Sequence, residues 1–324
     1  MKHHLIGIDI GGTKCAVTYG IKDVESIEIV DRAKFDTTHV EETVANLLEE
    51  TSVIMQKYSL NTGNTSAIGI SCGGPLDSKK GLIMSPPNLP GWDNIPIVAR
   101  FEKHFGVKTA VQNDANACAL AECKFGAARG YNNVIFLTFG TGMGAGLVLD
   151  GKLYAGTNDN AGEVGHIRLE KTGPVGYGKA GSFEGFCSGG GIAQLARVRV
   201  MEKLQMGDPV SFCSNMNEIN NLTAKTVAEA ADAGDTLAVE IYRECAQYLG
   251  KALSVLIDVL NPEIIVLGSI YCRAQGLIEQ TMLEVIDNET IIHARKVCKI
   301  VPAGLGESIG DYAALSVAAN ALIT

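Results

Sequence analysis

Two glycine-rich segments and one carboxylate are the first candidates for chemistry. The segment 11–14 (Gly-Gly-Thr-Lys) closely follows Asp9, and a glycine stands at every second position from Gly140 to Gly146. Turns without side chains let main-chain N–H groups approach a phosphate. The Thr13 hydroxyl can add a hydrogen bond, and Asp9 can hold Mg²⁺ through water. Both segments therefore predict phosphate contacts, although the first fits a plain hairpin turn equally well.

Neither segment matches a helix-based nucleotide motif. The spacing from Gly7 to Lys14 approaches a P-loop, but Thr and Lys stand in reverse order and a strand follows. The spacing from Gly140 to Ala145 approaches a dinucleotide fingerprint, which requires a helix next. The residues 147–149 are Leu-Val-Leu and predict a strand instead. Both segments are therefore interpreted as turns between strands.

Two further polar segments have alternative interpretations. Asp114 stands between a predicted strand and a predicted helix. It is suited to cap that helix, or alternatively to accept a proton from a substrate hydroxyl at the carboxyl end of the strand. Glu163 and His166 lie between glycines in a segment too polar for a core. They are suited to bind a substrate, or alternatively belong to a solvated loop.

Strands and helices that alternate along the chain position these residues. The expected strands are 5–9, 15–19, 67–71, 107–112, 134–139, 147–149 and 264–268, and the expected helices are 41–58, 115–125, 226–260 and 308–322. This alternation is typical of the α/β class. The strand–glycine–strand unit occurs twice, so two lobes are expected. We predict an N-terminal lobe of residues 1–115, joined by the terminal helix 308–324, and a C-terminal lobe of residues 116–307.

The composition excludes several classes of protein. The 324 residues include 27 Lys and Arg against 36 Asp and Glu, a net charge of −9, with no basic cluster, so no nucleic-acid partner is expected. No apolar run is long enough for a membrane span. Asp9 interrupts the first apolar run, which argues against a signal peptide. Nine scattered cysteines without a Cys-x-x-Cys pair indicate a reduced, cytoplasmic chain.

Together these segments resemble the ROK family of bacterial sugar kinases and sugar-responsive repressors, in the actin/hexokinase superfamily. The resemblance spans nearly the whole chain and depends on an ordered set of motifs. They are Asp9-x-Gly-Gly-Thr-Lys14, Gly73-Gly74-Pro75-x-Asp77, Pro87-Asn88-Leu89-x-Gly91-Trp92, Asn113-Asp114-Ala115-Asn116, Gly140-Thr141-Gly142-x-Gly144, Gly162-Glu163-x-Gly165-His166 and Glu184. The resemblance implies an α/β, two-lobed, actin-like ATPase (ribonuclease H-like) fold with an active-site cleft between its domains.

The resemblance also implies a role for each motif. Asp114 is expected to be the general base that acts on a sugar hydroxyl. The residues expected to bind the sugar are Gly74, Asn88, Asn113, Glu163, His166 and Glu184. Those expected to bind ATP and Mg²⁺ are Asp9, Gly11, Gly12, Thr13, Lys14, Gly140, Thr141, Gly142 and Gly268, with Asp9 reaching the metal through water. Ser269 departs from the family, which usually has a second glycine there.

A second departure concerns zinc. The family commonly carries three cysteines that bind a structural zinc together with a histidine. The matching positions hold Val175, Tyr177 and Ser182. Only His166 and the nearby Cys187 remain, whereas a closed zinc site needs four ligands. We therefore predict no structural zinc, and we expect packing of Val175, Tyr177 and Phe183 in its place.

The implied activity is ATP-dependent phosphorylation of a hexose hydroxyl, with a glucose-type sugar as the leading substrate. The alternatives are a kinase for N-acetylmannosamine, N-acetylglucosamine or fructose, and a non-catalytic sugar-sensing protein. The repressors of the family carry an added N-terminal DNA-binding domain. The first predicted strand already begins at Leu5, so we expect no helix-turn-helix. The family also implies a homodimer, whose contacts we expect in the C-terminal lobe.

Overall fold

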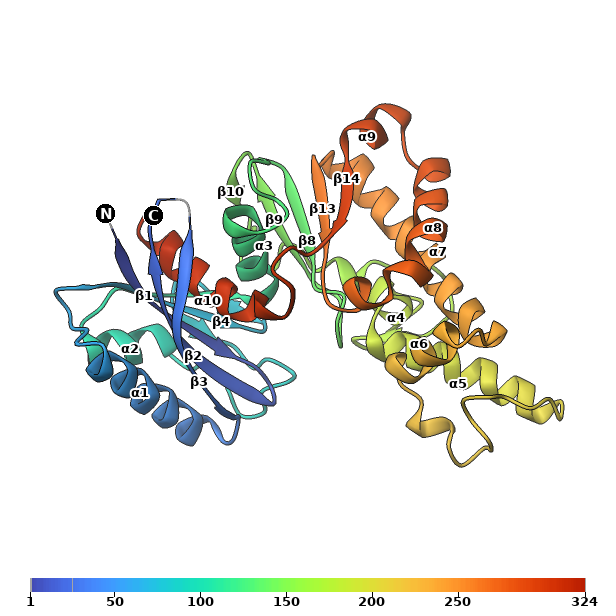
Figure 1. Cartoon of the computed structure of the whole chain (residues 1–324), viewed down its shortest axis with the longest axis horizontal. Helices are drawn as coiled ribbons and strands as arrows, with labels where there is room; N and C mark the ends of the chain where they lie inside the picture. The colour runs from blue at the N-terminus through green and yellow to red at the C-terminus, as the bar shows by residue number, and fades with distance from the viewer. Residues whose placement is uncertain (1, 25, 324) are drawn as a thin grey trace. The chain divides into compact units, whose positions relative to one another are not determined.

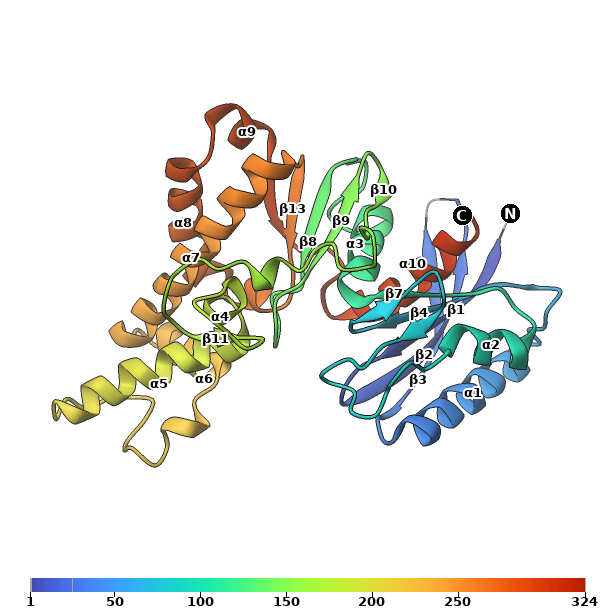
Figure 2. The ribbon, with the colours of Figure 1, turned by 180° about the vertical axis from the view of Figure 1, so that it is seen from behind.

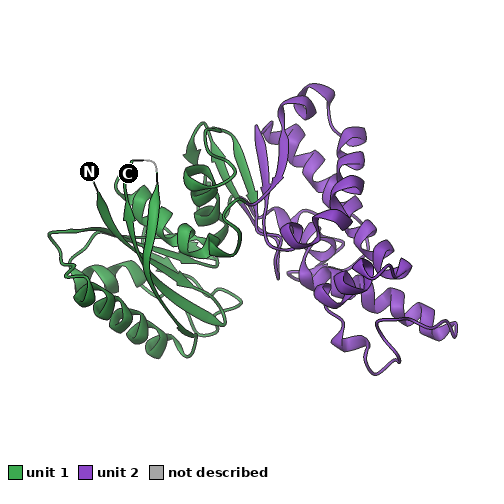
Figure 3. Ribbon diagram, in the orientation of Figure 1, with its two compact units in different colours: residues 1–136, 146–161, 304–324 green, residues 137–145, 162–303 purple. Residues whose placement is uncertain are grey.

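The computed structural model describes residues 2–24 and 26–323, and the chain divides into two compact units (Figure 1). Unit 1 comprises residues 1–136, 146–161 and 304–324, and unit 2 comprises residues 137–145 and 162–303 (Figure 3). The units differ from the predicted lobes because residues 116–136, 146–161 and 304–307 belong to unit 1. The division into lobes at residue 115 stays a prediction.

The centre of unit 1 is a five-stranded sheet in the order β3-β2-β1-β4-β7. The strands β1 (His3–Ile10), β2 (Lys14–Lys22) and β3 (Ile27–Asp36) form an antiparallel meander, and β4 (Thr65–Cys72) and β7 (Thr109–Asn113) run parallel to β1. The register aligns Ile10 with Cys72, and Cys72 with Asn113. The carboxyl ends of these three strands therefore lie in one row, where α/β sheets commonly bind ligands.

Side chains on β1 alternate between two cores, as expected for a strand covered on both faces. Ile6, Ile8 and Ile10 join a buried cluster with residues of α1 (Val40–Lys57) and α2 (Ile97–Phe105). Leu5 packs on the other face with α10 (Ile309–Ala321). Figure 1 shows α1 and α2 on one side of the sheet. Asp9 belongs to the same alternating set as Leu5 and therefore faces α10.

Glycines in the central strands let α10 approach the sheet closely. A Cβ atom on Gly69 would lie 2.1 Å from the Ala318 nitrogen, and one on Gly7 would lie 2.9 Å from the Leu315 nitrogen. Side chains at these positions would therefore force the helix away from the sheet. The sequence expectation that the terminal helix belongs with the N-terminal strands fits this packing, since α10 contacts β1 and β4.

Unit 1 also contains further strands and helices. They are β5 (Leu76–Asp77), β6 (Leu82–Ile83), α3 (Asp114–Phe125), β10 (Lys152–Leu153) and the short 3-10 helix Gly306–Ser308. β8 (Val134–Leu137) ends and β9 (Ala145–Leu149) begins at boundaries between the units. β10 pairs antiparallel with β9, and α3 packs on β9 at Gly146, where a Cβ would lie 2.2 Å from the Ala115 oxygen.

Unit 2 consists mainly of helices beside a parallel strand pair. Its strands are β11 (Val175–Gly176), β12 (Lys179–Ala180), β13 (Ile264–Leu267) and β14 (Lys299–Pro302). Its helices are α4 (Phe183–Phe186), α5 (Gly189–Gln205), α6 (Ala224–Asp232), α7 (Thr236–Leu260), α8 (Ile270–Glu289), α9 (Ile292–Val297), and the 3-10 helices Val164–His166 and Ile219–Asn221. The long helices α7 and α8 pack side by side (Figures 1 and 2). No helix within residues 2–24 and 26–323 is both long and apolar enough to cross a membrane.

The expected helix 226–260 is wrong in one respect, because the structure has two helices there. α6 ends before Gly234, whose φ is +90°, and Asp235 caps α7 by accepting a hydrogen bond from the Ala238 nitrogen at 3.0 Å. Glycine commonly follows the end of a helix, and aspartate is a common N-cap residue of the next one. β3, α5 and α8 were not among the expected elements.

Candidate active site

The hairpin between β1 and β2 presents the first glycine turn. The Gly11 nitrogen donates to the Lys14 oxygen at 3.1 Å, which closes the turn, and Gly12, Thr13 and Lys14 are exposed at its tip. Thr37 fastens the turn from outside: its nitrogen donates to the Thr13 oxygen at 2.9 Å, and its hydroxyl donates to the Gly11 oxygen at 2.7 Å. The tip is therefore a fixed, exposed main-chain loop. Nothing in the local sequence pointed to Thr37.

Asp9 lies next to this turn among other charged groups. Burial is the main cause that raises the pKa of Asp9 to about 7, and the negative charges of Asp114 and Asp311 add to the effect, while Arg32 opposes it. Asp311 on α10 is itself buried, accepts from the Thr18 hydroxyl at 2.9 Å and pairs with Arg32 at 2.9 Å. A cation near Asp9 would offset the repulsion among these carboxylates.

Two predicted sugar-binding residues of unit 1 pack against glycines. A Cβ on Gly12 would lie 2.6 Å from the Asn88 oxygen, and one on Gly73 would lie 3.3 Å from its Oδ1 atom. A Cβ on Gly74 would lie 3.1 Å from the Asn113 Nδ2 atom. The glycines therefore bring the phosphate-type turn, Asn88 and Asn113 together at the carboxyl end of the sheet.

Asn113, rather than Asp114, caps α3. The Asn113 Oδ1 atom accepts from the Ala115 nitrogen at 3.0 Å and from the Asn116 nitrogen at 3.5 Å. The Asp114 carboxylate is exposed and accepts one bond from the Ala115 nitrogen at 2.8 Å. Desolvation raises the pKa of this carboxylate, against the lowering effect of main-chain hydrogen bonds from Ala115 and Asp114. A carboxylate that is exposed and more basic than usual is suited to accept a proton.

The second glycine turn lies in unit 2 and contacts Glu184. The Gly140 nitrogen donates to the Gly142 oxygen at 3.0 Å, and the Met143 nitrogen donates to the Glu184 Oε2 atom at 3.0 Å. A Cβ on Gly142 would lie 2.8 Å from that same Oε2 atom. The turn therefore needs glycine here because the Glu184 carboxylate approaches its main chain. Thr141 is exposed on the turn.

Gly268 lies beside this turn, at the end of β13. Its nitrogen donates to the Leu137 oxygen at 2.9 Å, and a Cβ on Gly140 would lie 3.6 Å from the Ser269 Oγ atom. Ser269 has φ 49° and ψ −105°, a conformation that favours glycine, and its Oγ accepts from Arg273 Nη2 at 3.0 Å. Ser269 thus keeps a glycine-like main chain in place of the glycine usual in the family.

Glu163 and His166 are exposed beside the Glu184 segment. A Cβ on Gly165 would lie 2.2 Å from the Met143 oxygen and 3.2 Å from the Glu184 Cβ atom. The segment that carries Glu163 and His166 therefore packs on the second glycine turn. Unit 2 gathers Glu163, His166, Glu184 and Gly268 around this turn, whereas unit 1 gathers Asp9, Asn88, Asn113 and Asp114.

The expected packing of Val175 and Tyr177 in place of zinc is wrong. Their side chains are 47% and 67% exposed, and only Phe183 is buried. Ser182 instead caps α4 by accepting from the Gly185 nitrogen at 3.1 Å, and the buried Cys187 thiol donates to the Cys245 oxygen at 3.4 Å. No group of three metal-ligating side chains occurs in the described part of the chain.

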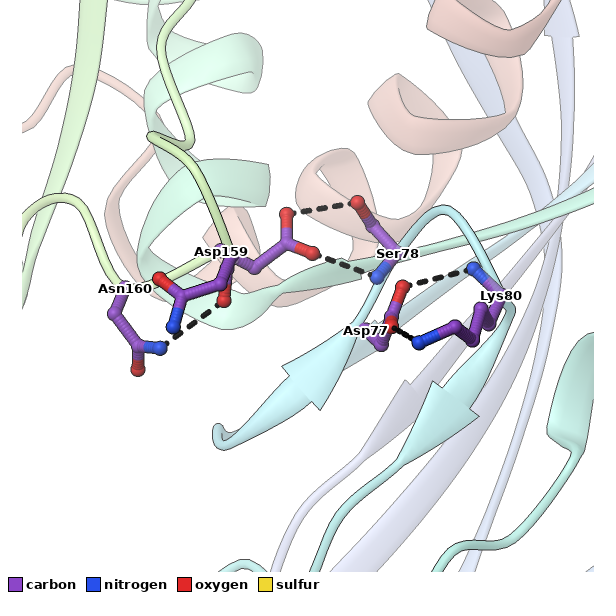
Figure 4. A network of polar contacts seen from close by, with 6 residues as sticks. Asp77, Ser78, Lys80, Asp159 and Asn160 are labelled. Atoms are coloured by element: carbon purple, nitrogen blue, oxygen red, sulfur yellow. Dashed lines mark hydrogen bonds and ion pairs between the residues drawn. The ribbon is translucent and has the colours of Figure 1, made fainter.

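A polar network fastens the hairpin β5–β6, which follows Gly74, to the loop that precedes Gly162 (Figure 4). The Asp159 carboxylate accepts from the Ser78 nitrogen at 2.8 Å and from its hydroxyl at 2.7 Å, all within unit 1. Asp77 and Lys80 form a separate ion pair of 2.8 Å on the hairpin. The hairpin and loop line a cavity of about 360 Å³.

The chain is similar to known proteins over most of its length. The ROK family model matches residues 5–320. A glucokinase of Halalkalibacterium halodurans is 32% identical over 268 residues, which cover 81% of this chain and 79% of that protein. A ROK family glucokinase from Streptomyces griseus, solved with glucose and AMPPNP, has a TM-score of 0.75 and 28% identity, covering 98% of this chain and 99% of that one.

A regulator is also structurally similar. A ROK family transcriptional regulator, described as a homologue of the E. coli MLC protein, has a TM-score of 0.84 and 25% identity, covering 98% of this chain and 78% of that one. These similarities confirm the predicted α/β fold of actin-like ATPases. With its ordered motifs and a family match over nearly its full length, the chain belongs to the ROK family.

Proposed function

We propose that this chain transfers the terminal phosphate of ATP to a hydroxyl group of a hexose, with a glucose-type sugar as the acceptor. The observation that carries the proposal is the exposed Asp114 carboxylate, which the Asn113 cap leaves available and whose pKa desolvation raises. The similarity to glucokinases, including one solved with glucose and an ATP analogue, supports the activity and the substrate.

The residues of the candidate site are suited to bind Mg²⁺ and a polyphosphate. Asp9 supplies a carboxylate oxygen, the donor that Mg²⁺ prefers, among negative charges that a cation would offset. Magnesium usually takes only one or two protein carboxylates together with substrate phosphates, so Asp9 suffices as the protein ligand. Mg²⁺, when bound, supplies positive charge that offsets the charge of the phosphates. The two exposed glycine turns would donate main-chain N–H groups to phosphate oxygens.

Asp114 would take the proton of the acceptor hydroxyl. As that oxygen forms its bond to the terminal phosphorus, the bond between this phosphorus and the bridging oxygen breaks, and ADP leaves. The polar side chains of Asn88, Asn113, Glu163, His166 and Glu184 would bind the remaining hydroxyl groups, because unpaired buried polar groups are costly. Phosphoryl transfer depends mainly on such positioning and on charge stabilisation.

The test is sugar-dependent release of ADP. The purified protein is incubated with Mg-ATP and, in turn, glucose, mannose, fructose, N-acetylglucosamine and N-acetylmannosamine, and ADP is measured by a coupled assay. We expect glucose to give the highest kcat/KM. A higher kcat/KM for an N-acetylhexosamine or for fructose would overturn the choice of substrate and leave the kinase activity standing.

A non-catalytic sugar sensor is the second candidate, because a transcriptional regulator is also structurally similar to this chain. The same preparation distinguishes the two. If calorimetry detects sugar binding while no sugar raises ADP release above the sugar-free rate, the sensor is supported and the kinase is contradicted.

A further inference from the structure

We propose that Tyr177 binds the sugar acceptor, with its ring covering an apolar face of the sugar beside His166. The proposal rests on the proposed function, since it assigns a contact of the same acceptor site. Tyr177 stands at the tip of the two-residue turn between β11 and β12, in unit 2.

The main chain at Tyr177 is unfavourable for a tyrosine. Its φ is 44°, and that of the next residue, Gly178, is 73°. Two-residue turns with positive φ at both positions favour asparagine and glycine, because a side chain at positive φ collides with its own backbone. Such strain persists only where surrounding contacts hold it, and it concentrates at functional sites.

Burial of the ring does not explain this strain. The Tyr177 side chain is 67% exposed, although tyrosine is large and mostly apolar. Its aromatic neighbour is His166, with ring centroids 6.0 Å apart and an interplanar angle of 72°. The turn thus presents an aromatic face to solvent, directly beside a residue expected to bind the sugar.

The hairpin that carries Tyr177 is held at both strands. The Gln194 side chain imitates a peptide group: its Nε2 donates to the Val175 oxygen at 2.8 Å, and its Oε1 accepts from the Val175 nitrogen at 2.9 Å. On the other strand, Lys179 Nζ donates to the His166 oxygen at 2.7 Å, and Arg168 Nη1 donates to the Ala180 oxygen at 2.7 Å. The main chain of the hairpin is therefore held beside the segment that carries His166.

The hairpin also contacts Glu184 closely. A Cβ on Gly176 would lie 2.7 Å from the Glu184 Cβ atom and 2.5 Å from the Gly185 nitrogen. One hairpin therefore joins an aromatic ring to the two polar residues His166 and Glu184. Ligand sites typically combine aromatic surface with a few placed polar groups. A pyranose ring has C–H groups on its faces and hydroxyl groups at its edge, so an uncharged hexose matches this set.

The test replaces Tyr177 with glycine, which removes the ring and also relieves the unfavourable φ. We expect Tyr177→Gly to melt at the same temperature as the wild type or higher. Its Kd and KM for the sugar should rise about tenfold, with the KM for ATP unchanged. Tyr177→Phe keeps the ring and should retain wild-type values. Val175→Ala, an exposed position of the same hairpin, is the matched control and should leave sugar binding unchanged.

Calorimetric binding of glucose without ATP separates this proposal from the proposed function. Wild-type protein that binds glucose without turnover would contradict the kinase and still test Tyr177. The Tyr177 proposal is overturned if Tyr177→Gly binds glucose as tightly as the wild type. It is also overturned if Tyr177→Phe or Val175→Ala weakens binding as much as Tyr177→Gly, because the ring would then not be the cause.

Discussion

Asn113 caps α3, and the neighbouring Asp114 is the proposed general base. The Asn113 side chain satisfies the first main-chain N–H groups of α3, so Asp114 is not needed as the cap. The sequence alone left both roles open for Asp114. The structure decides between them because α3 begins at Asp114, which makes Asn113 the N-cap residue. A helix boundary can be assigned to the exact residue only from the geometry of the cap. The exposed Asp114 carboxylate supports its role as base, which stays a proposal.

Replacing Asp114 with asparagine should therefore remove the base and preserve the shape of the site. We expect kcat to fall about 10²- to 10⁴-fold, the usual contribution of a general base, with the Kd for the sugar changed little. Steady-state kinetics and calorimetry measure the two effects. Asp77→Asn is the control, because it removes a partly exposed carboxylate of unit 1 that forms an ion pair with Lys80. Full activity of Asp114→Asn would exclude this base.

The pH dependence of kcat follows from the raised pKa of Asp114. The base acts when deprotonated, and desolvation makes it take up its proton at a higher pH than an ordinary aspartate. Activity should therefore be complete above this pKa and fall as the pH drops through it. In Asp114→Asn the limb that belongs to Asp114 should be lost, and a limb that remains should follow Asp9, whose pKa burial raises to about 7. A wild-type kcat that stays constant down to about pH 4, the ordinary range of aspartate, would contradict the assignment.

Among the elements, α10 illustrates what sequence patterns predict and what they omit. The apolar run near the C-terminus predicted a helix, and α10 confirms it. Its place on the sheet depends on Gly7 and Gly69, which lie in other elements and remove side chains where the helix main chain arrives. The sequence gives no sign that these glycines serve a helix more than 240 residues later.

Gly69→Ala should accordingly destabilise the protein. The added Cβ would lie 2.1 Å from the Ala318 nitrogen, so strand and helix must separate, at a cost of about 1–3 kcal/mol. Gly276→Ala is the matched control, because that glycine lies exposed within α8 with no atom near the added Cβ. It should stabilise the protein by about 0.5–1 kcal/mol. Chemical denaturation measures both, and equal effects of the two substitutions would contradict the packing argument.

The short elements of unit 2 could not be predicted from the periodicity of apolar residues. β11, β12 and α4 contain two to four residues each, too few to show a repeat. They are held by distant groups such as the Gln194 side chain. The expected helix 226–260 failed for the opposite reason, because its apolar pattern continues on both sides of Gly234.

In the molecule as a whole, the two glycine turns, Asp9 and Asp114 could be predicted because each belongs to a motif whose own residues are adjacent in sequence. Thr37, Asp311 and Tyr177 were not assigned a role in the site. Thr37 and Asp311 act on groups 26 and 293 residues away, at Gly11 and Thr18, which only the fold brings near. Residues that act over such distances in sequence can be identified only from the three-dimensional structure.

The whole chain should also fold without zinc. The positions that hold cysteines in much of the family are Val175, Tyr177 and Ser182, so a four-ligand site lacks its donors. Elemental analysis of the purified protein should find well below one equivalent of zinc, and a chelator should leave the melting temperature unchanged. About one equivalent of tightly held zinc would contradict this prediction.

The identity of the reaction product decides whether the chain phosphorylates a sugar. The protein is incubated with ATP, Mg²⁺ and glucose, and the products are identified by phosphorus NMR and mass spectrometry. We expect a glucose phosphate monoester and ADP in equal amounts. ATP that stays intact with every hexose tried, or inorganic phosphate formed in place of a sugar phosphate, would contradict it.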